Sequence, residues 1–224
     1  MNKRKAGVAF VGMGAVLILS ALLLFLYNEI SDSAREKETR TLYHDLQAVL
    51  EQRQSTAAVP LSPVPDETTA ETTQETSPVV EEPQTVTVQG YECIGILEIP
   101  ALALSLPVLS DWTYEKLEIA PCRQFGSAST DDLVIAGHNY KSHFKYLYEL
   151  RESDEIRLYD TAGREHTYEV VLVQSVQAED VDAVQNSGYD LVLYTCTYSG
   201  SARTAVFCNR VISTANIPIR LPKP

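Results

Sequence analysis

The first residue that could do chemistry is a cysteine at the end of an apolar run. Residues 191–196 read LVLYTC, and the turn-forming sequence TYSGS follows directly. A strand that ends in this way is a rigid platform with an exposed tip, which is where a protein must hold a nucleophile. A thiolate can attack a carbonyl carbon, so Cys196 is a candidate catalytic nucleophile. The alternative is an inert thiol, because free cysteines are among the residues most often buried.

A histidine follows a second apolar run in the same way. Residues 132–140 read DLVIAGHNY, so that Gly137 and His138 come directly after the run. Imidazole titrates near neutral pH and is the usual partner of a catalytic thiol, although a lone histidine is more often structural. Of the other three, His44 falls in a polar helical stretch, His143 in a predicted surface helix and His166 within a predicted strand. His138 is therefore the favoured acid/base.

An arginine lies seven residues beyond the cysteine. Arg203 precedes the run TAVFCNRVI, which predicts the next strand. If TYSGS joins two neighbouring strands, the guanidinium returns to the thiol and could hold the oxyanion formed when a thiolate attacks an amide. The alternative is a surface arginine beside a strand. Arg210 is the competitor, but it lies roughly 20 Å further along the strand.

The elements that must position these residues are mainly short strands. Runs of β-branched and aromatic residues between turn signals predict strands at 91–99, 102–109, 133–136, 155–159, 166–176, 191–196 and 203–213. Short helices are predicted at 113–119, 142–150 and 180–185, and a hairpin loop at 160–163. This number of short strands predicts an all-β domain closed into a barrel.

The N-terminus predicts a membrane anchor. Lys3, Arg4 and Lys5 precede an uncharged stretch from Ala6 to Tyr27, and these residues in a helix would span roughly 33 Å. The basic residues keep the N-terminus cytoplasmic, so the remainder is expected outside the cell membrane. A cleaved signal peptide is the alternative, but the run is long for one and SDSA at 31–34 is a poor cleavage site.

The chain therefore divides into four predicted parts. Residues 1–28 are the cytoplasmic tip and transmembrane helix, and 29–54 form a polar helical stalk whose apolar stripe (Leu42, Leu46, Val49 or Leu50) is thin. Residues 55–85, rich in Thr, Pro and Glu, are expected to be a disordered tether that gives the domain reach. Residues 86–224 form the catalytic domain, which should fold without the stalk.

Composition excludes several partners. The formal charge of −12 repels phosphate backbones, so nucleic acid is not expected to bind. The four cysteines form no CxxC pair and have no short spacing to histidine, so neither a metal nor any other cofactor is expected.

Together the three motifs resemble the sortases of Gram-positive bacteria. The family signature is a TLxTC strand end, an upstream His after a strand and Gly, and an Arg shortly beyond the Cys; here these read VLYTC, AGH and SAR, with Val192 in place of Thr. The resemblance implies a closed eight-stranded β-barrel and a cysteine transpeptidase. It also implies that Cys196 cleaves an LPxTG-like or NPxTN-like sorting signal, that a cell-wall or pilin amine accepts the product, and that Thr195 helps shape the substrate site.

The class of sortase and the rival functions stay open. The CTYSGSAR turn is closest to class B or its unclassified relatives, and no second apolar span follows Ile219 as in the pilus-polymerising type. The rivals are another exported cysteine peptidase of the cell wall, an L,D-transpeptidase, and a tethered binding module in which Cys196 only packs. CTYSGSAR lacks the SxGC-like context typical of L,D-transpeptidases.

Overall fold

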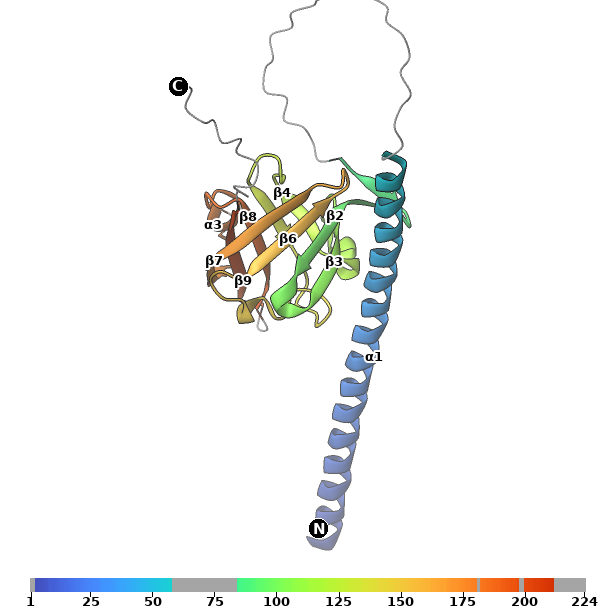
Figure 1. The fold of residues 1–224 in the computed structure, drawn as a ribbon. Helices are drawn as coiled ribbons and strands as arrows, with labels where there is room; N and C mark the ends of the chain where they lie inside the picture. Colours follow the sequence, from blue (N-terminus) through green and yellow to red (C-terminus); the bar gives the residue numbers. More distant parts are fainter. Residues whose placement is uncertain (1–2, 58–83, 181, 198–199, 212–224) are drawn as a thin grey trace, which may run out of the picture.

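The computed structural model describes residues 3–57, 84–180, 182–197 and 200–211. Its elements are α1 (Lys3–Ala57), β1 (Val86–Val88), β2 (Tyr91–Ile99), η1 (Pro100–Leu102), β3 (Leu104–Leu109), α2 (Tyr114–Ile119), β4 (Cys122–Phe125), β5 (Leu133–Ala136), η2 (Leu147–Glu149), β6 (Glu155–Asp160), β7 (Glu165–Gln177), α3 (Asp182–Gln185), β8 (Leu191–Cys196) and β9 (Ala202–Arg210). Figure 1 shows the strands gathered into one body, with α1 along its side.

Eight of the strands close into a barrel, as the sequence predicts. Their order is β2-β3-β4-β5-β8-β9-β7-β6, and β6 pairs back onto β2. The short β1 pairs with the beginning of β2 and extends the sheet outside this ring. The register of β2 against β3 shifts between Cys93 and Gly95, where the other edge of β2 changes its partner from β1 to β6. Gly95 has φ 157, and a Cβ there would meet the Tyr159 carbonyl oxygen at 2.1 Å, so only glycine allows the closure.

The central strands are apolar on both faces, which explains their continuous apolar runs. Leu133, Leu191 and Leu193 belong to the cluster inside the barrel. Val134 and Val192 belong to an outer cluster with residues of the α3 segment, which covers this face. A strand covered on both faces has no polar alternation, so β5 and β8 stand out in the sequence as short apolar blocks.

Most predicted strands are confirmed, and three of them (91–99, 133–136 and 191–196) have the predicted bounds. The short β1 and β4 were not predicted. The helix predicted at 142–150 is wrong, because this stretch consists of turns and the 3₁₀ helix η2. His143 is consequently not on a surface helix but fully buried. The turns hold it there, since the amide N–H groups of His143 and Phe144 donate to the carbonyls of Tyr140 and His138.

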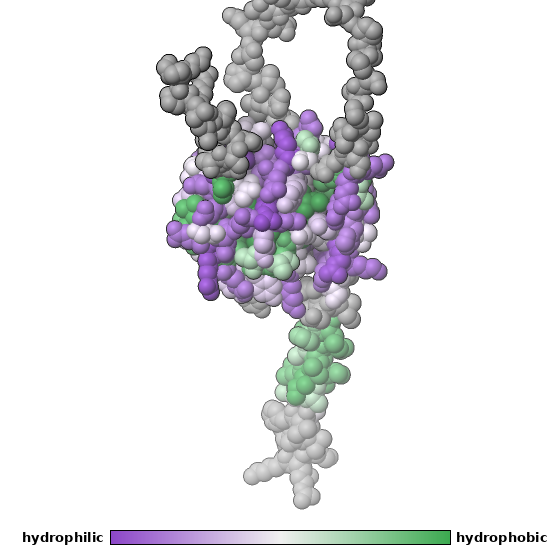
Figure 2. Space-filling model, viewed as in Figure 1, coloured by the Kyte–Doolittle hydropathy of each residue, from purple (hydrophilic) through white to green (hydrophobic). Residues whose placement is uncertain are grey.

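The first half of α1 carries apolar side chains in the open. Between Met13 and Tyr27 the large apolar residues are more than half exposed, and Figure 2 shows them as a green segment that projects from the barrel. Within the described residues, no stretch of helix combines the length and hydropathy of a membrane span.

The second half of α1 packs on the barrel, which differs from the predicted solvated stalk. Leu42 and Leu46 are fully buried and Leu50 nearly so. They share one cluster with Val86, Val88, Cys93, Ile96 and Leu109. Burying each leucine stabilises the contact by about 1.5–3 kcal/mol. The stripe that looked thin in the sequence is therefore a second core, built jointly by α1 and the strands. That the residues from 86 onward fold by themselves stays a prediction.

The predicted tether does not separate the barrel from α1. Residues 58–83 lie outside the described residues, but the segments on either side meet, since Leu50 and Val86 lie in the same cluster. Gln89 also donates to Asp45 of α1 at 2.6 Å. The helix, rather than the length of this segment, thus fixes the distance between the barrel and the exposed apolar part of α1.

Candidate active site

Cys196 is the last residue of β8 and faces outward. Along β8, Leu193 and Thr195 are buried, whereas Tyr194 and Cys196 are only half-buried, as expected when alternate side chains face opposite sides of a sheet. The other three cysteines are buried, and burial raises the pKa of Cys93 to about 11 and that of Cys122 to about 12. Cys196 is therefore the most accessible of the four free thiols.

Arg203 lies directly opposite Cys196. The two residues are partners in the antiparallel ladder of β8 and β9, a position in which side chains share one face with Cβ atoms about 5 Å apart. The Arg203 Nη1 donates to the carbonyls of Gly200 and Ala202, each at 3.2 Å. These contacts hold the guanidinium at the turn that follows the thiol. The structure thus brings this predicted pair together.

His138 follows the neighbouring strand. β5 runs parallel to β8 with Ala136 beside Tyr194, and the Gly137 amide extends the pairing by donating to the Tyr194 carbonyl at 3.0 Å. His138 is thus two residues past Ala136, as Cys196 is two residues past Tyr194. β5, β8 and β9 are adjacent, so all three predicted residues come from one end of the same three strands. Their catalytic roles stay predictions.

The surroundings of His138 favour its neutral form. The ring is half-buried, and burial lowers its pKa. Glu118 of α2 opposes this shift, while Arg35 of α1 adds to it. The ring stacks on Tyr140 with centroids 4.6 Å apart and planes at 23°. A neutral imidazole is the form that can accept a proton from a thiol or an amine.

Thr195 does not face the thiol. Its side chain is buried, and alternation along β8 turns it into the barrel, away from the face that carries Cys196. Among the described residues its hydroxyl has no hydrogen-bond partner. A side chain in this position cannot line a peptide groove on the outer face, so the predicted contact with substrate finds no support in its placement.

Sequence reasoning missed Tyr194, which shares the face of Cys196. Its hydroxyl donates to Gln124 Oε1 of β4 at 2.6 Å. Burial raises the pKa of Tyr194 to about 12, and the positive charge of Arg203 opposes this shift. The signal was present in the sequence, because a residue two positions before the nucleophile must share its side of the strand. Tyr194 is therefore a candidate wall of the substrate site.

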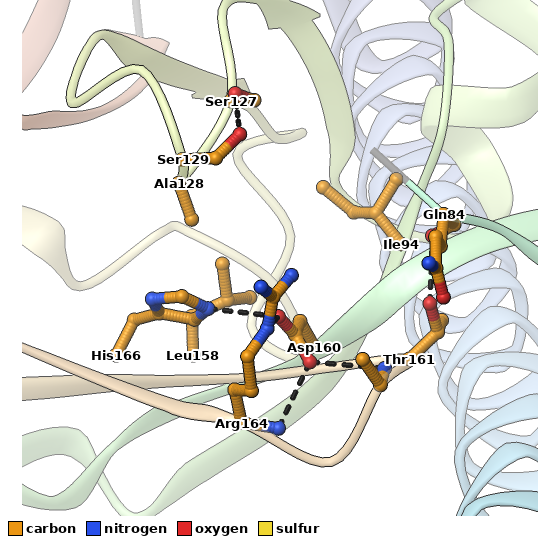
Figure 3. A pocket seen from close by; sticks show the side chains of 11 residues that line it. Gln84, Ile94, Ser127, Ala128, Ser129, Leu158, Asp160, Thr161, Arg164 and His166 are labelled. Atoms are coloured by element: carbon orange, nitrogen blue, oxygen red, sulfur yellow. Dashed lines mark hydrogen bonds and ion pairs between the residues drawn. The ribbon is translucent and has the colours of Figure 1, made fainter. Parts of the chain in front are cut away.

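The discarded competitors lie at the other end of these strands, Arg210 at the end of β9 and His166 at the beginning of the neighbouring β7. Arg210 Nη1 lies 2.9 Å from His166 Nδ1, and Arg210 Nε donates to Asp131 at 2.6 Å. His166 Nε2 in turn lies 2.9 Å from Asp160 Oδ2. Figure 3 shows His166, Asp160 and Arg164 around a cavity of about 30 Å³. This volume suits little more than a water molecule, so the cluster is a structural network rather than a peptide site.

Among the described residues, no three His, Cys, Asp or Glu side chains lie close enough together to bind a metal ion.

The chain is similar in sequence to a family of known proteins. The model of the sortase domain matches residues 97–212. Sortase A of Bacillus anthracis is 31% identical over 111 residues, which are 47% of this chain and 52% of that protein, so the chain spans about half the length of this curated relative. A sortase C1 structure from Streptococcus agalactiae is 23% identical, with 57% of this chain and 72% of that one covered and a TM-score of 0.49. Sortase E1 from Streptomyces coelicolor, solved with a tripeptide in the active site, is 19% identical, with 54% and 88% covered and a TM-score of 0.49.

Proposed function

Because the chain belongs to the sortase family, we propose that it is a membrane-anchored cysteine transpeptidase. Its substrates are an LPxTG-like or NPxTN-like sorting signal and an amine of the cell wall or of a pilin. Cys196 is the nucleophile, His138 the acid/base and Arg203 the oxyanion partner. The observation that carries the proposal is the cross-strand pairing of Cys196 with Arg203 at the end of the barrel where β5 delivers His138.

The chemistry follows from these three groups. His138 first takes the proton of the Cys196 thiol, and the resulting thiolate attacks the carbonyl carbon of the Thr in the sorting signal, so that the oxygen gains negative charge next to Arg203. The C–N bond breaks when His138 gives a proton to the leaving amine, which leaves a thioester on Cys196. An acceptor amine then attacks the thioester, His138 takes its proton, and the C–S bond breaks. His138 then returns this proton to the sulfur, so the net reaction exchanges one amide for another and regenerates the free thiol and the neutral imidazole.

Anchoring and location belong to the same proposal. The basic triplet Lys3, Arg4 and Lys5 and the uncharged run to Tyr27 support a single N-terminal span with the N-terminus in the cytoplasm. Two further observations support it: α1 continues without a break to Ala57, and its apolar residues between Met13 and Tyr27 are exposed. Water disfavours such a surface, whereas a bilayer would cover it. The barrel then lies on the extracellular side.

The test is a transpeptidation assay on the full chain in detergent, with LPxTG and NPxTN peptides and a soluble amine. The wild type should form a thioester detectable by mass and join the amine to the cleaved peptide, whereas Cys196→Ala should do neither. Arg203→Ala should lower kcat by about 10²–10³-fold while changing substrate binding much less. Arg210→Ala is the matched control, because Arg210 lies on the same strand within the distant network.

Two results would overturn the proposal. One is peptide cleavage that persists in Cys196→Ala. The other is a wild-type chain that hydrolyses the peptide without ever transferring it to an amine, which would indicate a peptidase.

A further inference from the structure

An arginine of α1 reaches the segment that carries His138. The Arg35 Nη1 donates to the Tyr140 hydroxyl at 2.9 Å, and its guanidinium carbon lies 5.0 Å from the centre of the Tyr140 ring. The same nitrogen makes an ion pair with Glu118 Oε2 at 2.9 Å. Arg35 is separated from Tyr140 by 105 positions, so only the packing of α1 on the barrel brings them together.

Tyr140 contacts both Arg35 and the candidate acid/base, His138. Its ring stacks on His138 with centroids 4.6 Å apart. The Tyr140 ring therefore touches the imidazole and the guanidinium at once, and its position limits how the imidazole can turn. A side chain packed on a ring that is itself fixed keeps its rotamer, which is what a catalytic group needs.

A second contact fixes the same segment one turn further along α1. The Thr39 hydroxyl donates to the Ile119 carbonyl at 2.6 Å and lies 3.0 Å from His143 Nε2. The single hydroxyl proton is used in the first bond, so the imidazole Nε2–H donates in the second. His143 is fully buried, so residues 140–143 are held against α1 at both ends.

Two charged side chains act on the protonation of His138, and two uncharged ring side chains, Tyr140 and His143, lie on the same segment. Arg35 of α1 disfavours the imidazolium and Glu118 of α2 favours it. Tyr140 stacks on the ring, and His143 is held neutral because burial lowers its pKa to about 4. The two members of the Arg35–Glu118 pair, which come from different helices, therefore shift the pKa of His138 in opposite directions.

We propose that Arg35 is a positioning residue for His138 that acts through the ring of Tyr140, so that docked α1 is part of the catalytic apparatus. This inference rests on the role given to His138 in the proposed function. It predicts that the helix which carries the membrane-proximal residues also holds the acid/base in its working orientation. Arg35 itself touches no reacting atom.

The test compares three variants of the full chain in detergent. Arg35→Gln removes the cation and Arg35→Lys keeps it. Arg40→Gln is the control, because Arg40 lies on the same helix, is exposed and makes an ion pair with Glu36 of that helix. Steady-state transpeptidation gives kcat and KM. Histidine labelled at ¹³Cε1 reports each pKa by NMR, and with four histidines in the chain single His→Gln variants assign the signals.

Arg35→Gln should lower kcat roughly tenfold with KM nearly unchanged. This loss is smaller than the full contribution of an acid/base to the rate, because His138 itself is still present. The pKa of His138 should rise in this variant, because the cation is gone and Glu118 loses its partner. Arg35→Lys should restore most of both values, and Arg40→Gln should match the wild type.

The inference fails if Arg35→Gln leaves both kcat and the His138 titration as in Arg40→Gln. It also fails if kcat falls only in proportion to lost folded protein, with the His138 titration unchanged. Failure of the proposed function looks different: the wild type then transfers no peptide, while the titration of His138 in Arg35→Gln still decides whether the contact through Tyr140 exists.

Discussion

Leu46→Ala tests whether α1 is part of the folded core. Leu46 is fully buried and lies in the middle of the apolar stripe that faces β1, β2 and β3. The substitution removes most of the side chain but leaves the helix intact, since alanine is the best helix former. Any loss of stability must therefore come from the lost packing.

The expected loss is about 2–4 kcal/mol. A fully buried leucine replaced by alanine costs about 2–5 kcal/mol, and the upper end applies where the surroundings cannot relax. Here one wall of the site is a helix that can shift, which favours the lower part of the range. A solvated stalk would instead give a change within about 0.5 kcal/mol.

Urea denaturation of the full chain in detergent, followed by near-ultraviolet circular dichroism, measures the difference. Thr41→Ala is the control, because Thr41 is exposed on the same stretch of α1. A fragment that begins at residue 86 should be less stable still, since it loses Leu42, Leu46 and Leu50 together. If Leu46→Ala unfolds at the same urea concentration as Thr41→Ala, α1 is not part of the core and the reasoning is refuted.

Three further predictions concern the barrel. Burial lowers the pKa of His143 to about 4, so the unfolded chain binds the proton first as the pH falls. The free energy of unfolding should therefore drop by up to about 3 kcal/mol between pH 6.5 and 4. Thermal melts at a series of pH values should show a weaker pH dependence for His143→Gln. Gly137→Ala should reduce kcat at least tenfold, because its Cβ would meet the ring of Phe144 at 2.4 Å and displace His138; retained kcat would contradict this. Arg210→Ala should cost about 1–3 kcal/mol in urea denaturation with kcat unchanged.

The sequence was informative where apolar blocks are bounded by turn residues. β5 and β8 are covered on both faces, so their side chains form continuous apolar runs, and the residues that follow each run mark the strand end. The pairing of Cys196 with Arg203 was also predictable, because TYSGS is short enough to join neighbouring strands. Both observations use only local sequence, and the structure has the predicted bounds for these two strands.

The sequence was uninformative where contacts join distant segments. Three leucines on α1 do not reveal whether the helix packs on the barrel or stays in solvent, because the surface that they contact is formed by β1, β2 and β3. The buried residues 143, 144, 147 and 150 have helical spacing, yet turns bury them equally well. β4 is four residues long and reads CRQF, with too little apolar character to be predicted. The contact between Arg35 and Tyr140 has no local signal at all.

Because Leu50 and Val86 lie in one cluster, the two described segments that flank residues 58–83 end and begin close to each other. The number of residues between these two ends is then only weakly constrained, because doubling the length of a chain between two fixed ends costs only about 0.6 kcal/mol. A protease that nicked the chain there would leave the barrel held to α1 by their shared core. The same site would accept an inserted reporter domain without displacing the thiol.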